Sequence, residues 1–286
     1  MPPRRLRLDA ELVRRGLARS REHASELISA RRVKVGGALA GKPATGVTTD
    51  VAIVVADDPD RPDFVSRGGH KLEGALAAFA HAGPPDGLGG LDVSGRRCLD
   101  AGASTGGFTD VLLRRGAREV VAVDVGYGQL AWRLRQDERV LVVDRTNVRD
   151  LRPDAIGGPV DVVVGDLSFI SLGLVLDALL GVTRPDGDLV LMVKPQFEVG
   201  KDRVGKGGVV RDLSLRAEAV TRVAEQAAEQ GWGARAVTTS PLPGPAGNVE
   251  YFLWLRRGEP HLRAADVGAE VERTASLGVA GEKVEP

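Results

Sequence analysis

The sequence predicts an α/β fold in which a mostly parallel sheet is covered by helices on both faces and follows a small α+β domain. From Cys98 onward, candidate strands and helices alternate along the chain, as they do where crossover helices join parallel strands. Several strands are continuous apolar runs, which is typical of parallel strands covered on both faces. Before them, residues 1–60 combine short helices with short strands and are rich in arginine.

The N-terminal segment is expected to hold two helices and two strands. Asp9 is placed to cap a helix that runs to Arg15 and ends at Gly16, and Ser20 is placed to cap a second helix. The apolar face of that second helix holds Ala24, Leu27 and Ile28. The expected strands and the turn that follows the first of them are Val33–Val35, Gly36-Gly37 and Val51–Val55.

Charge is distributed unevenly. Residues 1–42 contain eleven Lys and Arg against four Asp and Glu, a net charge of +7, whereas the whole chain is neutral. The remainder therefore carries −7. A basic head on an acidic body favours a polyanionic partner, and nucleic acid is the first candidate. A solvated, arginine-rich surface is the alternative that charge alone leaves open.

The predicted domain boundaries follow composition. Residues 1–60 form the basic domain, 61–67 a linker, 68–258 the α/β domain, and 259–286 a tail that is a fraying helix or disordered. The linker prediction rests on the acidic, proline-containing stretch Asp57–Asp63. A helix opens at 66–69 and keeps helical spacing at Leu72, Ala75, Leu76 and Phe79, before a loop at Gly83–Gly90.

Strands of the α/β domain are expected at Arg97–Asp100, Val120–Asp124, Val140–Asp144, Val160–Asp166, Leu189–Val193, Ala234–Thr239 and Tyr251–Leu255. Helices are expected at Phe108–Arg115, Leu130–Gln136, Leu172–Leu180 and Leu213–Gln230. Four of these strands end in aspartate. In a parallel sheet the strand carboxyl ends lie at one edge, where ligands bind, so this edge is the predicted site.

Composition also excludes some classes of protein. The single cysteine, Cys98, rules out a disulfide framework and fits a reducing compartment. The longest apolar runs are too short to span a bilayer, and no signal peptide is evident. We therefore expect a cytoplasmic protein that does not enter membranes.

The strongest local motif is Asp100–Phe108, which reads DAGASTGGF between a strand and a helix. Small residues there let backbone amides approach a ligand at a helix N-terminus. Asp124, about twenty residues on, stands where a ribose partner is expected. Together with Asp144 and Asp166 at the following strand ends, the loop predicts a site for a nucleoside-type cofactor. A turn without a ligand is the alternative.

Two further motifs follow strands. Asp166-Leu167-Ser168-Phe169 comes after the fourth strand of the α/β domain, although Ser168 and Ser171 are also ordinary helix-capping residues. Lys194 ends a buried apolar strand, where burial penalises its charge, and a snorkelling surface lysine is the alternative. Asn248-Val249-Glu250 places one more carboxylate before the last strand.

In combination these motifs resemble the TlyA-type haemolysin/rRNA methyltransferase family over Arg4 to Arg256. The motifs that carry the resemblance are SRGGHKL, LDAGASTGGFTDVLL, DVGYGQLAW, DLSFISL, LMVKPQFEVGK and GNVEYFLWL. The N-terminal part is similar to the RNA-binding fold of ribosomal protein S-four, and the remainder to FtsJ-type ribose methyltransferases. The resemblance implies a Rossmann-like class I sheet that uses S-adenosyl-L-methionine and no metal. It also implies 2′-O-methylation of cytidine in ribosomal RNA, in both 16S and 23S rRNA of the ribosomal subunits.

The resemblance also implies roles for individual residues. Its Lys-Asp-Lys-Glu catalytic tetrad falls on Lys71, Asp166, Lys194 and Glu250. The cofactor-binding residues are expected to be Gly102, Ala103, Ser104, Thr105, Gly106, Gly107, Phe108, Asp124, Asp144, Asp166 and Leu167. The RNA-binding residues, nominated with the charge pattern, are Arg5, Arg7, Arg19, Arg21, Lys42, Arg67 and Arg133.

The expected chemistry is removal of a proton from a ribose hydroxyl that is aligned with an activated methyl group. Lys194 is expected to be the base, which requires its neutral form, and Lys71 the neighbour that favours that form and steadies the developing oxyanion. Asp166 and Glu250 would orient the lysines and the hydroxyl. Three other readings stay open: a non-catalytic ribosome-binding protein, a membrane-active haemolysin, and, less favoured, a nicotinamide oxidoreductase.

Overall fold

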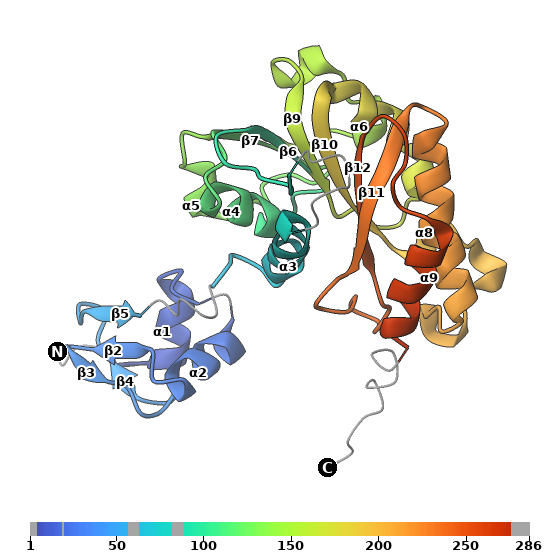
Figure 1. The fold of residues 1–286 in the computed structure, drawn as a ribbon. Coiled ribbons are helices and arrows are strands. Elements are labelled where there is room, and N and C mark those ends of the chain that lie inside the picture. The colour runs from blue at the N-terminus through green and yellow to red at the C-terminus, as the bar shows by residue number, and fades with distance from the viewer. Residues whose placement is uncertain (1–4, 19, 57–62, 82–88, 276–286) are drawn as a thin grey trace. The chain divides into compact units, whose positions relative to one another are not determined.

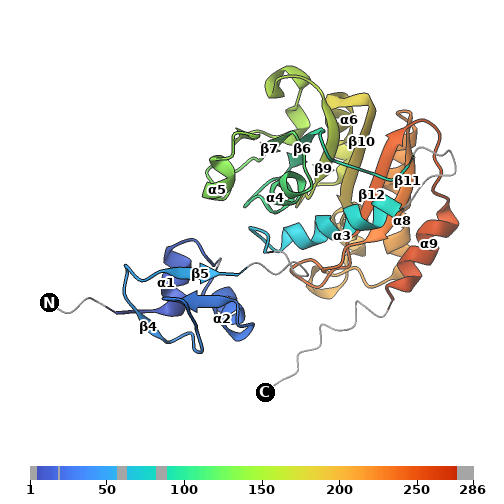
Figure 2. The same cartoon turned by 60° about the vertical axis from the view of Figure 1, so that its left-hand side comes forward.

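The computed structural model describes residues 5–18, 20–56, 63–81 and 89–275. The chain divides into two compact units, Met1–Ser66 and Arg67–Pro286 (Figures 1 and 2). Each has its own hydrophobic core and is described by itself. The predicted α/β fold with a small α+β domain before it is confirmed.

The first unit contains two short helices and two small sheets. The helices are α1 (Leu8–Arg14) and α2 (Arg21–Ser29), which pack on each other. One sheet pairs β1 with β4 and the other has the order β3-β2-β5, all pairs antiparallel. The strands are β1 (Leu6–Arg7), β2 (Val33–Val35), β3 (Ala38–Leu39), β4 (Gly46–Val47) and β5 (Ile53–Val55).

Local sequence signals account for part of this unit. Ser20 caps α2 by accepting a hydrogen bond from the His23 N–H at 3.1 Å, as predicted. Gly36 and Gly37 both have positive φ and form the predicted tight turn, here joining β2 to β3. The short strands β1, β3 and β4 were not predicted, because two residues carry no periodicity.

The predicted cap at Asp9 is wrong. The N-cap position of α1 is Arg7, and Asp9 lies within the helix, where it is buried. Its carboxylate is paired with Arg7 (2.9 Å) and Arg21 (3.0 Å). An aspartate that binds two arginines does not have to cap a helix, and the two arginines keep about half of their side-chain surface exposed.

The second unit is a seven-stranded sheet with the order β11-β12-β10-β9-β6-β7-β8. The strands are β6 (Arg97–Ala101), β7 (Glu119–Val123), β8 (Val140–Val143), β9 (Val160–Gly165), β10 (Thr183–Val193), β11 (Trp232–Thr239) and β12 (Tyr251–Arg257). All neighbours from β8 to β10 are parallel, whereas β12 is antiparallel to both β10 and β11. Chain order reverses at β6, which has β7 on one side and β9 on the other. Such a reversal marks the point where open α/β sheets bind ligands.

Helices cover both faces of this sheet. They are α3 (Gly68–His81), α4 (Gly107–Arg114), α5 (Trp132–Arg135), α6 (Leu176–Val182), α7 (Pro195–Glu198), α8 (Leu213–Ala228) and α9 (Ala264–Arg273). On one face α3 packs on α4 (Figures 1 and 2), and rings of these helices contact the sheet in the pairs Phe79–Trp254 and Phe108–Phe252. On the other face α6, α8 and α9 share one core with residues such as Leu99, Leu191 and Leu253. Burial on both faces explains why these strands read as continuous apolar runs.

Element boundaries differ from the predictions at four places. The helix expected over 130–136 is reduced to α5, and the one expected over 172–180 begins as a 3₁₀ turn at Leu172–Leu174 before α6. Strand β10 begins six residues earlier than expected, at Thr183. The tail contains the helix α9, and residues 276–286 lie outside the described part. The proposed loop and linker residues 82–88 and 57–62 lie outside it as well.

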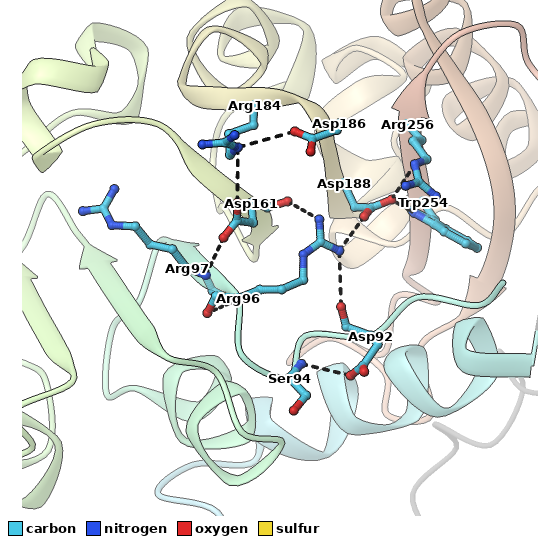
Figure 3. A network of polar contacts seen from close by, with 11 residues as sticks. Asp92, Ser94, Arg96, Arg97, Asp161, Arg184, Asp186, Asp188, Trp254 and Arg256 are labelled. Atoms are coloured by element: carbon cyan, nitrogen blue, oxygen red, sulfur yellow. Dashed lines mark hydrogen bonds and ion pairs between the residues drawn. The ribbon is translucent and has the colours of Figure 1, made fainter. Parts of the chain in front are cut away.

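A network of charged side chains connects neighbouring strands at the end of the sheet that lies opposite the strand carboxyl ends (Figure 3). Buried Asp188 accepts hydrogen bonds from Arg96 Nη1 (2.7 Å) and from the indole N–H of Trp254 (2.8 Å). Asp161 accepts the Arg97 backbone N–H. These contacts join β6, β9, β10 and β12, so this end of the sheet is fixed by structural ion pairs. Among the described helices, none is long and apolar enough to cross a membrane.

Candidate active site

Asp100, near the end of β6, anchors the loop between β6 and α4 through hydrogen bonds to the first turn of α4. Asp100 Oδ2 accepts hydrogen bonds from the Thr109 N–H (2.8 Å) and Thr109 Oγ1 (2.7 Å), which joins the end of the strand to the first turn of the helix. Burial raises the pKa of Asp100 to about 7, against these two hydrogen bonds, with the nearby charges of Asp166 and Asp124 adding to the rise. Asp100 therefore shapes the loop from inside the core.

Gly106 has a backbone conformation and surroundings that favour glycine. Its φ is +94°, and a Cβ there would lie 2.3 Å from Leu134 Cδ1 and 2.7 Å from Leu130 Cδ1. The crowding therefore comes from the α5 region, whereas the sequence predicted a close approach to a ligand. A side chain at Gly106 would displace the loop or these two leucines.

Asp124, directly after β7, holds the other side of the loop. One carboxylate oxygen accepts the Ser104 N–H at 2.8 Å and the other accepts the Gly126 N–H at 2.7 Å. Each oxygen keeps a further lone pair, so the carboxylate can also accept from a hydroxyl group of a ligand.

A cavity of about 450 Å³ lies beside this loop, within the size range of small-molecule sites. Its polar lining comes from the ends of β6, β7, β8 and β9, and apolar side chains supply much of the rest. The lining residues are Gly102, Ser104, Asp124, Val125, Gln129, Asn147, Val148, Asp166, Leu167, Ser168, Phe169, Ile170 and Val175. A flat apolar ring with a polar edge and an attached diol matches this lining.

Five of the predicted cofactor residues line the cavity: Gly102, Ser104, Asp124, Asp166 and Leu167. The others do not, and they are Ala103, Thr105, Gly106, Gly107, Phe108 and Asp144. Phe108 is buried against Phe252, and Asp144 forms an ion pair with Arg135 and accepts the Gly128 N–H at 3.1 Å. The structure therefore does not place these six residues on the cavity wall.

Strand register brings three of the four tetrad positions, Asp166, Lys194 and Glu250, toward one edge. Gly165 of β9 lies opposite Leu191 of β10, and Val193 lies opposite Tyr251 of β12. Asp166 and Lys194 therefore follow neighbouring strands, and Glu250 immediately precedes the next one. Because β12 runs antiparallel, its start lies where the other two strands end.

The tetrad forms two ion pairs. Lys71 Nζ on α3 lies 2.5 Å from Glu250 Oε2, and Lys194 Nζ lies 2.6 Å from Asp166 Oδ1. Lys194 is 7% exposed and Glu250 is 1% exposed, whereas 26% of the Asp166 side chain remains exposed. Each lysine thus lies beside a carboxylate of opposite charge.

Two segments around Lys194 are joined by a series of contacts. Phe169 and Phe197 pack with ring centroids 5.4 Å apart. Buried Glu198 accepts hydrogen bonds from Ser171 Oγ (2.6 Å) and the Leu172 N–H (2.8 Å). Burial raises the pKa of Glu198, against these hydrogen bonds. The loop after β9 is therefore fastened to α7.

A family model described as FtsJ-like methyltransferase matches residues 64–257, more than half of the chain. The chain belongs to the FtsJ-like methyltransferase family. The resemblance inferred from the motifs is thereby confirmed. The arrangement of an FtsJ-like methyltransferase explains why the glycine-rich loop, the cavity and the tetrad positions share one edge of the sheet.

Relatives match nearly the full length of this FtsJ-like methyltransferase. The 16S/23S rRNA (cytidine-2′-O)-methyltransferase TlyA of Mycobacterium tuberculosis is 60% identical over 276 residues, covering 96% of this chain and 99% of the relative. YqxC of Bacillus subtilis, named as an rRNA methyltransferase, is 42% identical and covers 89% of this chain and 87% of its own. A solved structure from Streptococcus thermophilus, named as a hemolysin, is 34% identical with a TM-score of 0.71 and covers 97% and 98% of the two chains.

The first unit matches an S4 domain model over residues 6–53. Of the residues nominated for RNA binding, Arg5 and Lys42 are exposed in this unit, and Arg7 and Arg21 share Asp9. Arg19 lies outside the described residues. In the second unit Arg67 is exposed, and Arg133 is paired with Asp110 at 2.6 Å.

Sequence reasoning missed several residues of the cavity. Gln129 and Asn147 are polar residues that follow β7 and β8, and a rule that follows each strand past its last residue would have found Asn147. The apolar members Val125, Val148, Ile170 and Val175 carry no local signal, because an apolar residue in a loop cannot be told from one that packs in the core. Phe169 is 91% exposed and has a φ of +64°, and nothing in the sequence around it indicated that this aromatic side chain would be exposed.

Proposed function

We propose that this chain transfers a methyl group from S-adenosyl-L-methionine to the ribose 2′-hydroxyl of cytidine in ribosomal RNA, in both 16S and 23S rRNA. The observation that carries this proposal is the pairing of Lys71 with Glu250 and of Lys194 with Asp166 beside a nucleoside-sized cavity. The substrate is proposed from the 60% identity to a protein named for that reaction.

The cavity residues suit S-adenosyl-L-methionine. Asp124 would accept from the ribose hydroxyls, and apolar side chains such as Val125 and Val148 would contact the faces of the adenine. Gly102 and Ser104 would leave room for the methionine part near the helix N-terminus. When bound, this cofactor supplies a methyl group that is already activated by its sulfonium charge.

The chain then has to align the hydroxyl and remove its proton. Lys194 in its neutral form would take the proton, and Asp166 would hold the amine and orient it. Lys71, held by Glu250, would provide positive charge near the developing oxyanion. Burial of Lys194 and Glu250 would limit the access of water to these two groups.

The S4 unit would supply much of the affinity for RNA. The exposed Arg5 and Lys42, together with Arg7 and Arg21, would contact phosphates, which are the main source of sequence-independent affinity. Arg67 and Arg133 would extend this contact on the methyltransferase unit.

The test is transfer of labelled methyl from S-adenosyl-L-methionine to purified small and large ribosomal subunits that lack the modification, followed by mapping of the modified nucleotide. We expect label at a cytidine ribose in both 16S and 23S rRNA. Label on a base, or no label despite tight subunit binding, would contradict the proposal, and the second result would favour a non-catalytic ribosome-binding protein. Leakage from liposomes would favour the haemolysin reading.

A further inference from the structure

Lys194 has a second polar partner outside the tetrad. Its Nζ donates to Ser168 Oγ at 2.8 Å, while Asp166 Oδ1 lies 2.6 Å from the same nitrogen. Ser168 also lines the cavity. The ammonium group of Lys194 therefore lies between a carboxylate and a hydroxyl, two partners that behave differently when the lysine loses its proton.

A carboxylate can accept hydrogen bonds but cannot donate them, so Asp166 can accept an N–H of Lys194 but cannot donate to the lone pair of its neutral amine. A serine hydroxyl both donates and accepts. It can accept from the ammonium and, after a rotation of its O–H, donate to the lone pair of the neutral amine. Of these two polar partners, Ser168 is therefore the one that can accept from the ammonium and also donate to the neutral amine.

The backbone next to Ser168 has a strained turn that neighbouring contacts stabilise. The next residue, Phe169, has φ +64°, which is a strained conformation for a bulky side chain. This turn is supported by the Phe169–Phe197 ring contact and by the two hydrogen bonds from Ser171 and Leu172 to Glu198. Such support is needed where a strained loop must keep one geometry.

The charged groups around Lys194 come from several elements. Asp166 follows β9, and Glu250, with its partner Lys71 on α3, precedes the neighbouring strand β12. The ring of Phe197 on α7 lies 5.9 Å from Nζ. None of these groups can donate a hydrogen bond to a neutral amine except the ammonium of Lys71, which is already engaged by Glu250.

We propose that Ser168 is a positioning residue for Lys194: its hydroxyl holds the lysine nitrogen toward the cavity both before and after the lysine loses its proton. This inference rests on the proposed function, in which neutral Lys194 is the base. It adds a fifth side chain to the tetrad and gives the DLSFISL motif a chemical role besides helix capping.

The first test needs no catalysis. Acylation of lysine by acetic anhydride, followed by peptide mass spectrometry, measures the reactivity of Lys194 relative to Lys71 in the full chain without cofactor. A hydroxyl partner lowers this reactivity either by occupying the lone pair or by favouring the ammonium. We therefore expect the Lys194 to Lys71 ratio to rise several-fold in Ser168→Ala and to return toward the wild-type value in Ser168→Thr.

Ser214→Ala is the control, because it also removes a serine hydroxyl, but one that donates to Asp212 at the start of α8 and touches neither Lys194 nor the loop after β9. An equal rise in this variant, or no rise in Ser168→Ala, would overturn the proposal. Using Lys71 as the internal reference excludes a general opening of the site, since that would expose both lysines.

The second test is kinetic. A hydrogen bond to a charged group corresponds to roughly 10- to 100-fold in rate. We expect Ser168→Ala to lose kcat by about that factor with little change in KM for cofactor or subunits, and Ser168→Thr to recover most of it. A change confined to KM would overturn the proposal. If wild type transfers no methyl group while the acylation ratio still responds to Ser168, the proposed function fails and the contact stands.

Discussion

Thr109 donates both its backbone N–H and its hydroxyl to one oxygen of Asp100, so the first turn of α4 is fastened to the end of β6 by a single buried carboxyl. No hydrogen-bond partner of the other oxygen, Oδ1, is found in the described structure, and this oxygen is buried. Burial of a carboxyl group in this setting costs little free energy when the group is protonated and much more when it is charged.

A pH dependence of stability follows from this. Since the folded pKa of Asp100 is about 7 and the ordinary value is 3.8, the folded state binds a proton that the unfolded state releases between these pH values. The contribution of Asp100 to the free energy of unfolding therefore falls as pH rises from about 4 to 7. Relative to Asp100→Asn, wild type should lose roughly 2–4 kcal/mol between pH 4 and pH 8. Urea unfolding at both pH values measures it, and parallel curves for the two proteins would contradict it.

Gly106→Val should disturb the cofactor loop. The new side chain meets Leu130 and Leu134 and adopts a φ that valine avoids, so we expect a loss of roughly 2–5 kcal/mol in stability and at least about tenfold in cofactor affinity. Gly231→Ala is the control, because Gly231 also has positive φ, +79°, with open space around it. It should cost about 1–2 kcal/mol and leave affinity unchanged. Calorimetry with unchanged affinity in Gly106→Val would remove the loop from the binding site.

Lys194→Ala should abolish methyl transfer while cofactor affinity stays near the wild-type value, because Lys194 is not among the residues that line the cavity. Lys194→Arg should also be inactive, since arginine keeps its charge in proteins and cannot act as a base. Single-turnover transfer to subunits measures this. Substantial turnover by the arginine variant would show that Lys194 holds charge in place and does not take the proton.

Binding to ribosomal subunits should weaken steeply with salt. Each phosphate contact contributes roughly 0.7–0.9 to the slope of log affinity against log salt concentration. Arg5→Ala and Lys42→Ala should each flatten the slope by about one contact, because both side chains are exposed in the S4 unit. Arg273→Ala, on α9, should leave it unchanged. If Arg5→Ala and Lys42→Ala keep the wild-type slope, as Arg273→Ala is expected to, then Arg5 and Lys42 do not contact RNA.

A chain of residues 67–286 should stay folded and bind cofactor as the full chain does. Its core consists of residues from the sheet and from α6, α8 and α9, and the first unit has a separate core. Methyl transfer to subunits should fall by at least about tenfold with the loss of phosphate contacts. Thermal melting checks the fold of the shortened chain. Transfer at the full rate would show that the S4 unit is dispensable for recognition.

The sequence predicted the architecture well because long apolar runs have few alternatives. Strands β9 and β12 are buried on both faces, and their continuous apolar residues predict strands of a covered sheet. The start of β10 was missed because Arg184-Pro185-Asp186-Gly187 has the composition of a turn, yet a register shift lets the strand continue through it. A local pattern cannot show that a neighbouring strand will extend such a segment.

The candidate site was predicted in part for a similar reason. Asp124 and Asp166 were found because they follow strands, and strand ends meet at one edge. Asp144 follows a strand too, but Arg135 captures its carboxylate, and that contact depends on where α5 packs. The role of Ser168 was hidden because a serine before a helix has an ordinary explanation, whereas in the structure its hydroxyl contacts a lysine from another strand.

The position of β12 also determines when the ion pair between Lys71 and Glu250 can form during synthesis of the chain. Strand β11 pairs with β12, and β10 has β12 as its second neighbour, so the sheet is completed by a segment that leaves the ribosome after all the other strands. Glu250 arrives with that segment, so its ion pair with Lys71 cannot form earlier. Under the proposed function, a nascent or C-terminally shortened chain would carry its S4 unit and its glycine-rich loop without a complete reaction centre.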